Sequence, residues 1–491
     1  MDNVDEQVVE TVAAPELQSV EQVPKVSKRK NLFALIPWLK KFARMRSFQF
    51  LLVFPNLALF YFFLIAGLVG SPIGNRNIII VFVWILWWFL LITLMVPFLS
   101  RIWCIMCPFP FFGEWLQRGA LVKVRSGKTG GLRNMMFGLN KRWPRSLSNI
   151  WIQNIGFLTL ATFCALLVTR PIVSVFVLGG LFVLATVLAV VYQRRVFCNY
   201  ICPVGGFLGL YSMSSTIELR AQNPEVCLKC KEKNCATGSE NGWACPWFLY
   251  MGKLDRNNFC GLCMECVKSC TKDNIGLFTR APFSDTLIKG YDEAWKAFIM
   301  LALAMVYSIV LLGPWGFVKD WANVSEKGDW GGFLLFAAAT WSTCLLIFPG
   351  IWALTTWLGK KFSRTKTVQW KQLFLRYSYV FVPLGLFAWI AFSFPLVMVN
   401  GTYIISVASD PLGEGWDLFG TAHMPWIPIY PEYAVYIQII VLLAGLGFAL
   451  KKGYDVGKML FDDEKQLARS FAPVAVLCVL VTVGFLIMFA G

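Results

Sequence analysis

The residues with the clearest chemical signature are eight cysteines gathered in one polar stretch of the chain. The downstream half has the spacing Cys-x2-Cys-x2-Cys-x3-Cys, at which three thiolates wrap one iron–sulfur cubane and the fourth reaches a neighbouring cluster. The upstream half reads Cys-x2-Cys-x4-Cys and, after nine further residues, Cys-Pro. If the last cysteine of each half binds the cluster of the other half, the pattern predicts two [4Fe–4S] clusters. The predicted ligands are Cys260, Cys263, Cys266 and Cys245 for the first, and Cys227, Cys230, Cys235 and Cys270 for the second.

The upstream half departs from the usual ferredoxin spacing, and two alternatives to the cluster assignment remain. Four residues stand where two are standard, and Thr271 replaces the proline that usually follows the last cysteine. These changes lengthen the loop around the second cluster without removing a ligand. Zinc is one alternative, although structural zinc sites favour two separated cysteine pairs. Disulfides are the other, and a reducing cytosol disfavours them.

A second set of cysteines lies in two similar loops, Cys104-x2-Cys107-Pro and Cys198-x3-Cys202-Pro. Each loop follows an Arg, an apolar and an aromatic residue and precedes a run rich in Phe and Gly, which indicates an internal repeat. Four thiolates brought together would repel one another unless a cation joined them. Three interpretations stay open: a third iron–sulfur cluster or another metal, redox-active dithiols, or packing residues of a tight turn. No histidine follows either loop, which excludes attachment of a c-type haem.

The remaining cysteines and the single histidine carry weaker signals. Cys164, Cys344 and Cys478 stand alone within apolar runs, where a free cysteine packs as a small hydrophobe. His423 is the only histidine, so a haem held by two histidines of this chain is excluded. The alternatives for His423 are a loop residue, one axial ligand completed by a partner, or a role at a docking surface or quinone pocket.

Membrane helices must position these cysteines. Of the 491 residues, 57% are hydrophobic and only 15% are charged, against ~25% charged in an average soluble domain. Apolar runs recur that are long enough to cross a ~30 Å hydrocarbon core at ~1.5 Å per residue. We therefore expect an all-α membrane bundle of about nine transmembrane helices. The expected spans are 48–70, 78–99, 150–169, 173–192, 295–313, 331–353, 374–394, 434–450 and 470–490.

The formal net charge of +17 reflects how these helices are oriented. Basic loops stay on the cytoplasmic side, and a cytoplasmic N-terminus satisfies this rule at almost every loop. It places both Cys-Pro loops and the cysteine-rich insert in the cytoplasm. The basic residues left outside are Arg76, Arg170, Lys319 and Lys327. The charge therefore indicates contact with anionic lipid rather than nucleic acid. Without a cleavable signal peptide before the first span, we expect a multi-pass protein of a prokaryotic plasma or inner membrane.

The chain divides into four segments by composition. Residues 1–47 read as a cytoplasmic tail, disordered in 1–24 and then basic, and the outer loop 395–433 carries His423 with several aromatic residues. The other three segments are a four-helix membrane core with the Cys-Pro loops at 48–219, a small α+β insert of the bacterial 2[4Fe–4S] ferredoxin type at 220–280, and a five-helix membrane module at 281–491.

Over about residues 48–280 the chain resembles the polyferredoxin membrane proteins of the NapH/NosR/CcoG type. Four spans, paired Cys-Pro loops and a following ferredoxin pair carry the resemblance. The first loop departs from the family's Cys-x3-Cys-Pro by one residue. The resemblance implies electron transfer between a quinone pool or membrane partner and a redox protein, namely a cytochrome or reductase subunit.

These observations favour an electron carrier subunit with no catalytic residue of its own. Two alternatives remain: an enzyme that reduces a quinone or a metal ion at the Cys-Pro site, and an assembly factor that matures the iron–sulfur site of another enzyme. The spans contain few ionisable residues, which disfavours an ion pump.

Overall fold

The computed structural model describes residues 29–119, 138–312 and 316–490, most of which are helical. Within these residues eight helices are long and apolar enough to cross a membrane. Their bounds are Phe48–Val69, Ile78–Leu99, Pro171–Val191, Tyr291–Leu312, Trp330–Ser363, Trp370–Ser409, Pro431–Leu460 and Glu464–Phe489. The predicted membrane bundle is thus confirmed, with eight such helices rather than about nine.

The difference lies at the predicted span 150–169. This region forms two shorter helices, α10 (Trp151–Thr162) and α11 (Cys164–Thr169), which meet at Phe163. The Thr162 hydroxyl donates a hydrogen bond to the carbonyl of Leu158 at 2.8 Å. Such back-bonding bends helices, and it falls at the last residue before the break.

The other membrane helices of the first half are α4 (Phe48–Val69), α12 (Pro171–Val191) and a mixed helix from Ile78 to Leu99. The mixed helix contains π-helical turns at Val81–Trp87 and Leu91–Met95 between its α-helical pieces, α5 (Ile78–Ile80), α6 (Trp88–Leu90) and α7 (Val96–Leu99).

The second half begins with α17 (Tyr291–Tyr307), which packs against both α10 and the long helix α23 (Phe381–Ser409). Proline is tolerated in membrane helices, and α23 continues through Pro395. The outer loop that we placed at 395–433 therefore starts only at Asp410. The other helices are α18 (Gly316–Ala322), α19 (Val324–Lys327), α20 (Trp330–Ser342), α21 (Phe348–Ser363), α22 (Trp370–Tyr377), α24 (Ala434–Leu460) and α25 (Glu464–Ala490).

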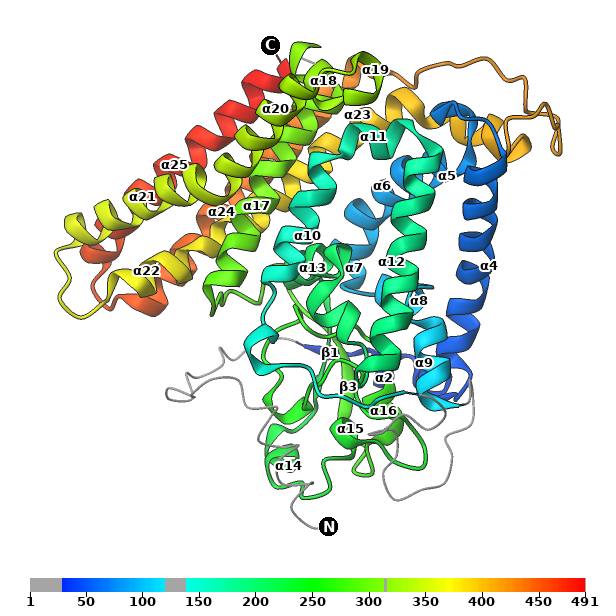
Figure 1. The fold of residues 1–491 in the computed structure, drawn as a ribbon. Coiled ribbons are helices and arrows are strands. Elements are labelled where there is room, and N and C mark those ends of the chain that lie inside the picture. The colour runs from blue at the N-terminus through cyan, green and yellow to red at the C-terminus, as the bar shows by residue number, and fades with distance from the viewer. Residues whose placement is uncertain (1–28, 120–137, 313–315, 491) are drawn as a thin grey trace.

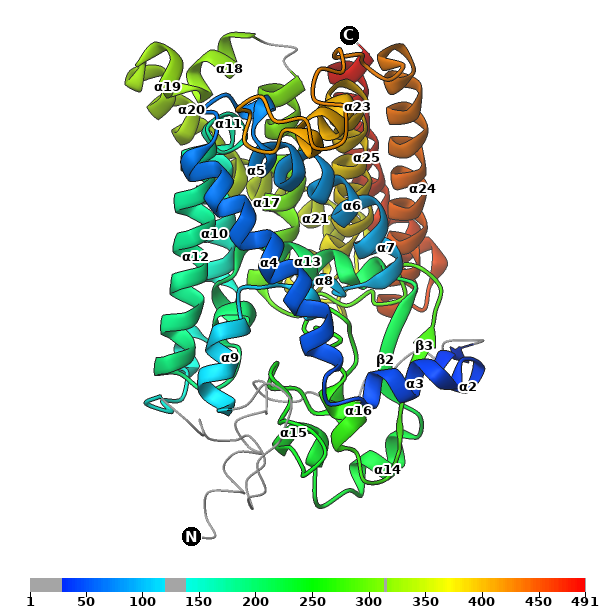
Figure 2. The ribbon, with the colours of Figure 1, turned by 90° about the vertical axis from the view of Figure 1, so that its right-hand side faces the viewer.

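A small sheet joins the bundle to the cysteine-rich insert. Its antiparallel strands are ordered β1-β3-β2, and Ala221 of β2 faces Ile275 of β3 at the point where the insert leaves and returns. Figures 1 and 2 show the sheet and the insert at one end of the bundle, with α18, α19 and the orange loop 410–430 at the other. The strands are β1 (Lys30–Asn31), β2 (Ile217–Ala221) and β3 (Ile275–Thr279), and the insert helices are α14 (Pro224–Leu228), α15 (Asn234–Thr237) and α16 (Glu265–Ser269).

The described part of the predicted N-terminal tail is folded. Strand β1 pairs with β3, and helices α2 (Leu32–Leu35) and α3 (Pro37–Arg44) follow it (Figure 2). Asp273 of the insert forms ion pairs with Lys40, at 2.8 Å, and with Arg44. The described segment 29–47 therefore contacts the insert and its sheet. The stretch 1–24, predicted to be disordered, lies outside the described residues.

Candidate functional site

The two Cys-Pro loops bring their four thiols together. Cys104 lies in the short helix α8 (Trp103–Met106), and Cys107 follows that helix. Cys198 lies in a π-helical turn, Phe197–Ile201, and Cys202 ends it. Burial raises the pKa of the Cys107 thiol far above its usual value, and the charges of the other three thiols raise it further. Each loop thus contributes two sulfur atoms to one buried group.

Cys202 also begins helix α13 (Pro203–Tyr211). Its Sγ accepts a hydrogen bond from the Gly205 amide at 3.2 Å, and Pro203 occupies the first helical position, where its missing N–H costs nothing. Burial raises the pKa of Cys202 to about 11, although the Gly205 amide and Arg101 favour its thiolate. The Cys-Pro sequence therefore both ends one turn and caps the next helix with the sulfur inward.

The insert cysteines fall into two neighbouring groups. Burial raises the pKa of Cys266 far above normal, and the thiols that raise it next are Cys263, Cys260, Cys245 and, last, Cys235. The first three are the cysteines that the crossed assignment places with Cys266, and the assignment itself stays a prediction.

In the other group, burial raises the pKa of Cys227, and its thiol neighbours are Cys270 and Cys230. Burial also raises the pKa of Cys235, to about 12, and its neighbours include Cys245, Cys227 and Cys270. The two groups therefore adjoin one another where Cys235 and Cys245 meet.

The backbone on either side of Cys263 adopts a conformation that directs amide groups toward cysteine sulfur. Leu262 and Met264, on either side of it, both have positive φ, 51° and 63°. This conformation is costly for side chains larger than glycine and persists only where the surroundings enforce it. It lets the Leu262 amide donate to the Cys260 thiol and the Glu265 amide to Cys263. Amide hydrogen bonds to cysteine sulfur are a feature of iron–sulfur sites, so the donor set fits a cluster.

In the described ranges, no group of three or more His, Cys, Asp or Glu side chains is arranged to hold a single metal ion. Each thiolate on a cubane binds a different iron atom, so cubane ligands lie farther apart than the ligands of one ion.

Two arginines at equivalent places of the repeat join the Cys-Pro loops to the insert. Arg101 is 2% exposed, donates to the Asn258 carbonyl at 2.6 Å and lies 4.3 Å over the Trp247 ring, while its Nε and Nη2 have no hydrogen-bond partner. Arg195 donates to the Cys104 carbonyl at 3.0 Å, and its amide donates to the Pro246 carbonyl. Asn258 and Pro246 flank Cys260 and Cys245, so the first insert group lies beside the Cys-Pro thiols.

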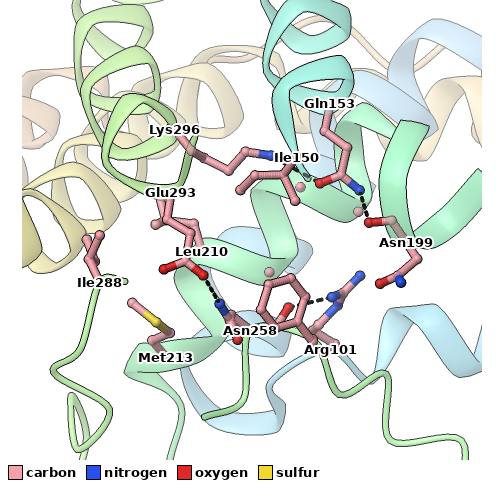
Figure 3. Close-up of a pocket in the computed structure, with 14 residues that line it drawn as sticks. Arg101, Ile150, Gln153, Asn199, Leu210, Met213, Asn258, Ile288, Glu293 and Lys296 are labelled. Carbon is pink, nitrogen blue, oxygen red and sulfur yellow. Dashed lines mark hydrogen bonds between the residues drawn. The ribbon is translucent and has the colours of Figure 1, made fainter. Parts of the chain in front are cut away.

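A small pocket opens next to Arg101 (Figure 3). Arg101, Asn258 and Glu293 line one part of it, and Lys296 and Gln153 line another. Glu293 accepts from Arg256 at 2.8 Å and from Asn258 at 3.1 Å. Sequence reasoning missed this group. The available signal was a lysine inside an apolar span, which in a membrane helix marks a functional hypothesis.

The buried positive charges near the Cys-Pro loops indicate what the four thiols could hold. In the part of the chain that the structure describes, neither Arg101 nor Lys296 has a carboxylate within ion-pair distance, and both are almost completely buried. Unpaired buried cations are expensive. A [4Fe–4S] cluster held by four thiolates carries net negative charge, and it would supply the missing counter-charge. The site therefore fits such a cluster.

The remaining candidates lie apart from this site. Cys164, Cys344 and Cys478 are buried within their helices, as expected of core residues. His423 is exposed in the loop 410–430.

Comparison with known proteins agrees with this chemistry. Residues 80–130 and 175–218 match the family described as "4Fe-4S binding domain". These two stretches contain the two Cys-Pro loops and stop before the insert. The match supports [4Fe–4S] clusters, and together with the fold it defines a multi-pass membrane iron–sulfur protein.

Two curated proteins are similar over part of the chain. The first is the "Putative electron transport protein YccM" of Escherichia coli, 29% identical over 184 residues, which cover 32% of this chain and 48% of that protein. The second is the "Uncharacterized protein MJ0750" of Methanocaldococcus jannaschii, 37% identical over 78 residues, which cover 16% and 28%. The chain thus spans half or less of the length of these relatives. No solved structure matches.

Proposed function

We propose that this protein is a membrane electron carrier with three [4Fe–4S] clusters, two in the insert and a third at the Cys-Pro loops. The observation that carries the proposal is the group formed by Cys104, Cys107, Cys198 and Cys202, which lies beside unpaired buried cations. The family match to both loops supports iron and sulfide at that place over the dithiol and packing alternatives. When bound, such clusters supply one-electron transfer.

The positions of the cysteines support a row of three stations. Helices α14 and α15, which carry Cys227 and Cys235, lie farther from the bundle than α16, which carries Cys266 (Figures 1 and 2). The Cys-Pro thiols follow the mixed helix Ile78–Leu99 and helix α12 in the chain. We place the second insert cluster outermost, the first in the middle and the Cys-Pro cluster nearest the membrane. The chain's own residues bury most of these thiols, and backbone amides donate to several of the sulfur atoms.

This row suits exchange between a soluble redox partner at the insert and an acceptor or donor in the membrane, a quinone or a membrane protein. The cytoplasmic side of a prokaryotic inner membrane is the place that the charge distribution supports for the insert. The name of the E. coli relative also refers to electron transport. Membership of the NapH/NosR/CcoG type belongs to the same proposal, as do the ligand assignments.

The test is iron and sulfide analysis of the purified protein with EPR of the reduced state. Three clusters require about twelve iron atoms per chain. Changing Cys198→Ala should remove about four of them and one EPR signal, whereas the core change Cys344→Ala should remove none. About eight iron atoms in the unchanged protein would overturn the third cluster, and fewer would overturn the insert pair.

A further inference from the structure

Lys296 is a charged residue at a place where membrane proteins rarely keep one. It lies in α17, within the apolar span Tyr291–Leu312, and is 1% exposed. A buried lysine in a span needs a partner that repays the loss of water around its ammonium group. The segment that carries it is the C-terminal module, which lies outside the residues matched by the 4Fe-4S binding family.

The lysine side chain reaches the second Cys-Pro loop. Its Nζ donates to Gln153 Oε1 at 3.2 Å, and Gln153 Nε2 donates to the carbonyls of Asn199, at 2.9 Å, and Cys198, at 3.3 Å (Figure 3). Gly206 makes room for the ammonium group, because a Cβ at that position would lie 2.0 Å from Nζ. The ammonium group is therefore packed against the first turn of α13, four residues after Cys202.

The acids near Lys296 lie beyond ion-pair distance of its ammonium group in the described residues. Glu293 pairs with Arg256 at 2.8 Å, and the Asp292 carboxylate accepts from the Ile150 amide at 3.1 Å. The other cation at the pocket is Arg101. In the described residues, the hydrogen-bond partner of the Lys296 ammonium is thus the neutral amide of Gln153.

We propose that Lys296 is a positioning residue that holds its positive charge against the Cys-Pro cluster and raises the reduction potential of that cluster. The inference rests on the proposed third cluster and adds a role for the C-terminal module. Reduction takes one electron from an external donor and adds one negative charge to the cluster. A nearby cation stabilises the reduced form more than the oxidised form, because the Coulomb energy grows with the charge. Without the positive charge of Lys296, the Cys-Pro cluster would therefore have a lower reduction potential.

The experiment is a reductive titration of the full chain with dithionite, followed by EPR of each cluster signal. Lys296→Met removes the charge and keeps most of the side-chain volume. It should lower the ratio of reduced to oxidised Cys-Pro cluster at fixed potential about tenfold, which corresponds to about 59 mV for a one-electron couple. The two insert signals should keep their potentials. Lys296→Arg, which keeps the charge, should shift the Cys-Pro signal much less.

Two further variants provide a second test of the Lys296 position and a control. Gly206→Ala changes no charge, but it displaces the ammonium group and should shift the same signal in the same direction. Lys289→Met, an exposed lysine seven residues earlier in the chain, should leave all three signals unchanged. Absence of a third signal in the unchanged protein would overturn the proposed function. A third signal whose potential stays constant in both Lys296→Met and Gly206→Ala would overturn the role of Lys296 alone.

Discussion

Glu114 and Arg195 tie the two Cys-Pro loops to each other through a buried bidentate ion pair. Glu114 follows the first loop by seven residues, and Arg195 precedes Cys198 by three. Arg195 Nε and Nη2 donate to the two carboxylate oxygens at 2.6 and 2.9 Å. The same arginine reaches the Cys104 carbonyl. One guanidinium thus fixes the relative position of both thiol pairs.

Replacing Glu114 by Gln should destabilise the protein strongly, because it leaves Arg195 buried without its counter-charge. Breaking one side of a buried pair costs about 3–5 kcal/mol. Burial alone would raise the pKa of Glu114, but Arg118 and Arg195 outweigh it and lower the pKa from 4.5 to about 2. The contribution is therefore complete above pH 4.5 and is lost as the pH falls toward 2.

Thermal unfolding in detergent measures this effect, and Glu225→Gln serves as a control because Glu225 is exposed. The control should change stability by less than about 0.5 kcal/mol. Equal midpoints for the two variants at neutral pH would contradict the assigned role of Glu114.

The crossed ligand assignment predicts which substitutions act together. Cys245→Ala and Cys263→Ala should abolish the same EPR signal, although Cys245 lies closer in sequence to Cys235 than to Cys263. Cys270→Ala should abolish the other insert signal, although it lies four residues from Cys266. Each change should remove about four iron atoms. If Cys270→Ala and Cys263→Ala removed the same signal, the crossing would be wrong.

Gly261 should tolerate no side chain. A Cβ there would lie 2.2 Å from the Trp247 ring, which Arg101 covers on its way to Asn258. Gly261→Ala should therefore cost about 1–3 kcal/mol through overpacking and broaden the signal of the first insert cluster. The matched change Gly447→Ala adds a methyl group where nothing lies within 4 Å, and it should leave the EPR spectrum as it is.

The ion pairs of Asp273 with Lys40 and Arg44 should contribute little to global stability, and their effect should be confined to the segment 29–47. Asp273 is largely exposed. Burial is the largest single influence and raises its pKa, but the hydrogen bonds and charges of Lys40 and Arg44 together outweigh it, so the pKa lies below its usual value. Exposed pairs contribute about 0.2–1 kcal/mol and are screened by salt. Asp273→Asn should leave the global midpoint nearly unchanged while it speeds proteolysis within 29–47 at low salt. Equal cleavage rates in the variant and the unchanged protein would show that β1 and α2, rather than these pairs, hold the segment.

The sequence was most informative where local composition decides structure. The first two spans were expected at 48–70 and 78–99, and the helices are Phe48–Val69 and Ile78–Leu99. Long apolar runs leave a chain in lipid little choice but a helix. The spacing of the insert cysteines is typical of [4Fe–4S] sites, and their division between two clusters stays a prediction.

Features that depend on distant residues could not be read in this way. Lys40 and Asp273 are 233 positions apart, and Lys296 and Gln153 are 143 apart. No local pattern reports such contacts, so the folded N-terminal segment and the partners of the pocket lysine were missed. Pro395 misled for another reason: it reads as the end of a helix in water, whereas α23 continues past it.

The pairing of strand β1 with β3 imposes a delay during biosynthesis of the protein. Lys30 pairs with Thr279, so the first strand to leave the ribosome waits for a partner made about 250 residues later. At ~5–20 residues per second, that wait lasts roughly 12–50 s. Helix α3, which packs against α16 and its Cys266, follows directly after β1 in the chain. The insert cysteines are made near the end of that wait, so α3 is already present when they emerge, and it can cover α16 once β3 pairs with β1.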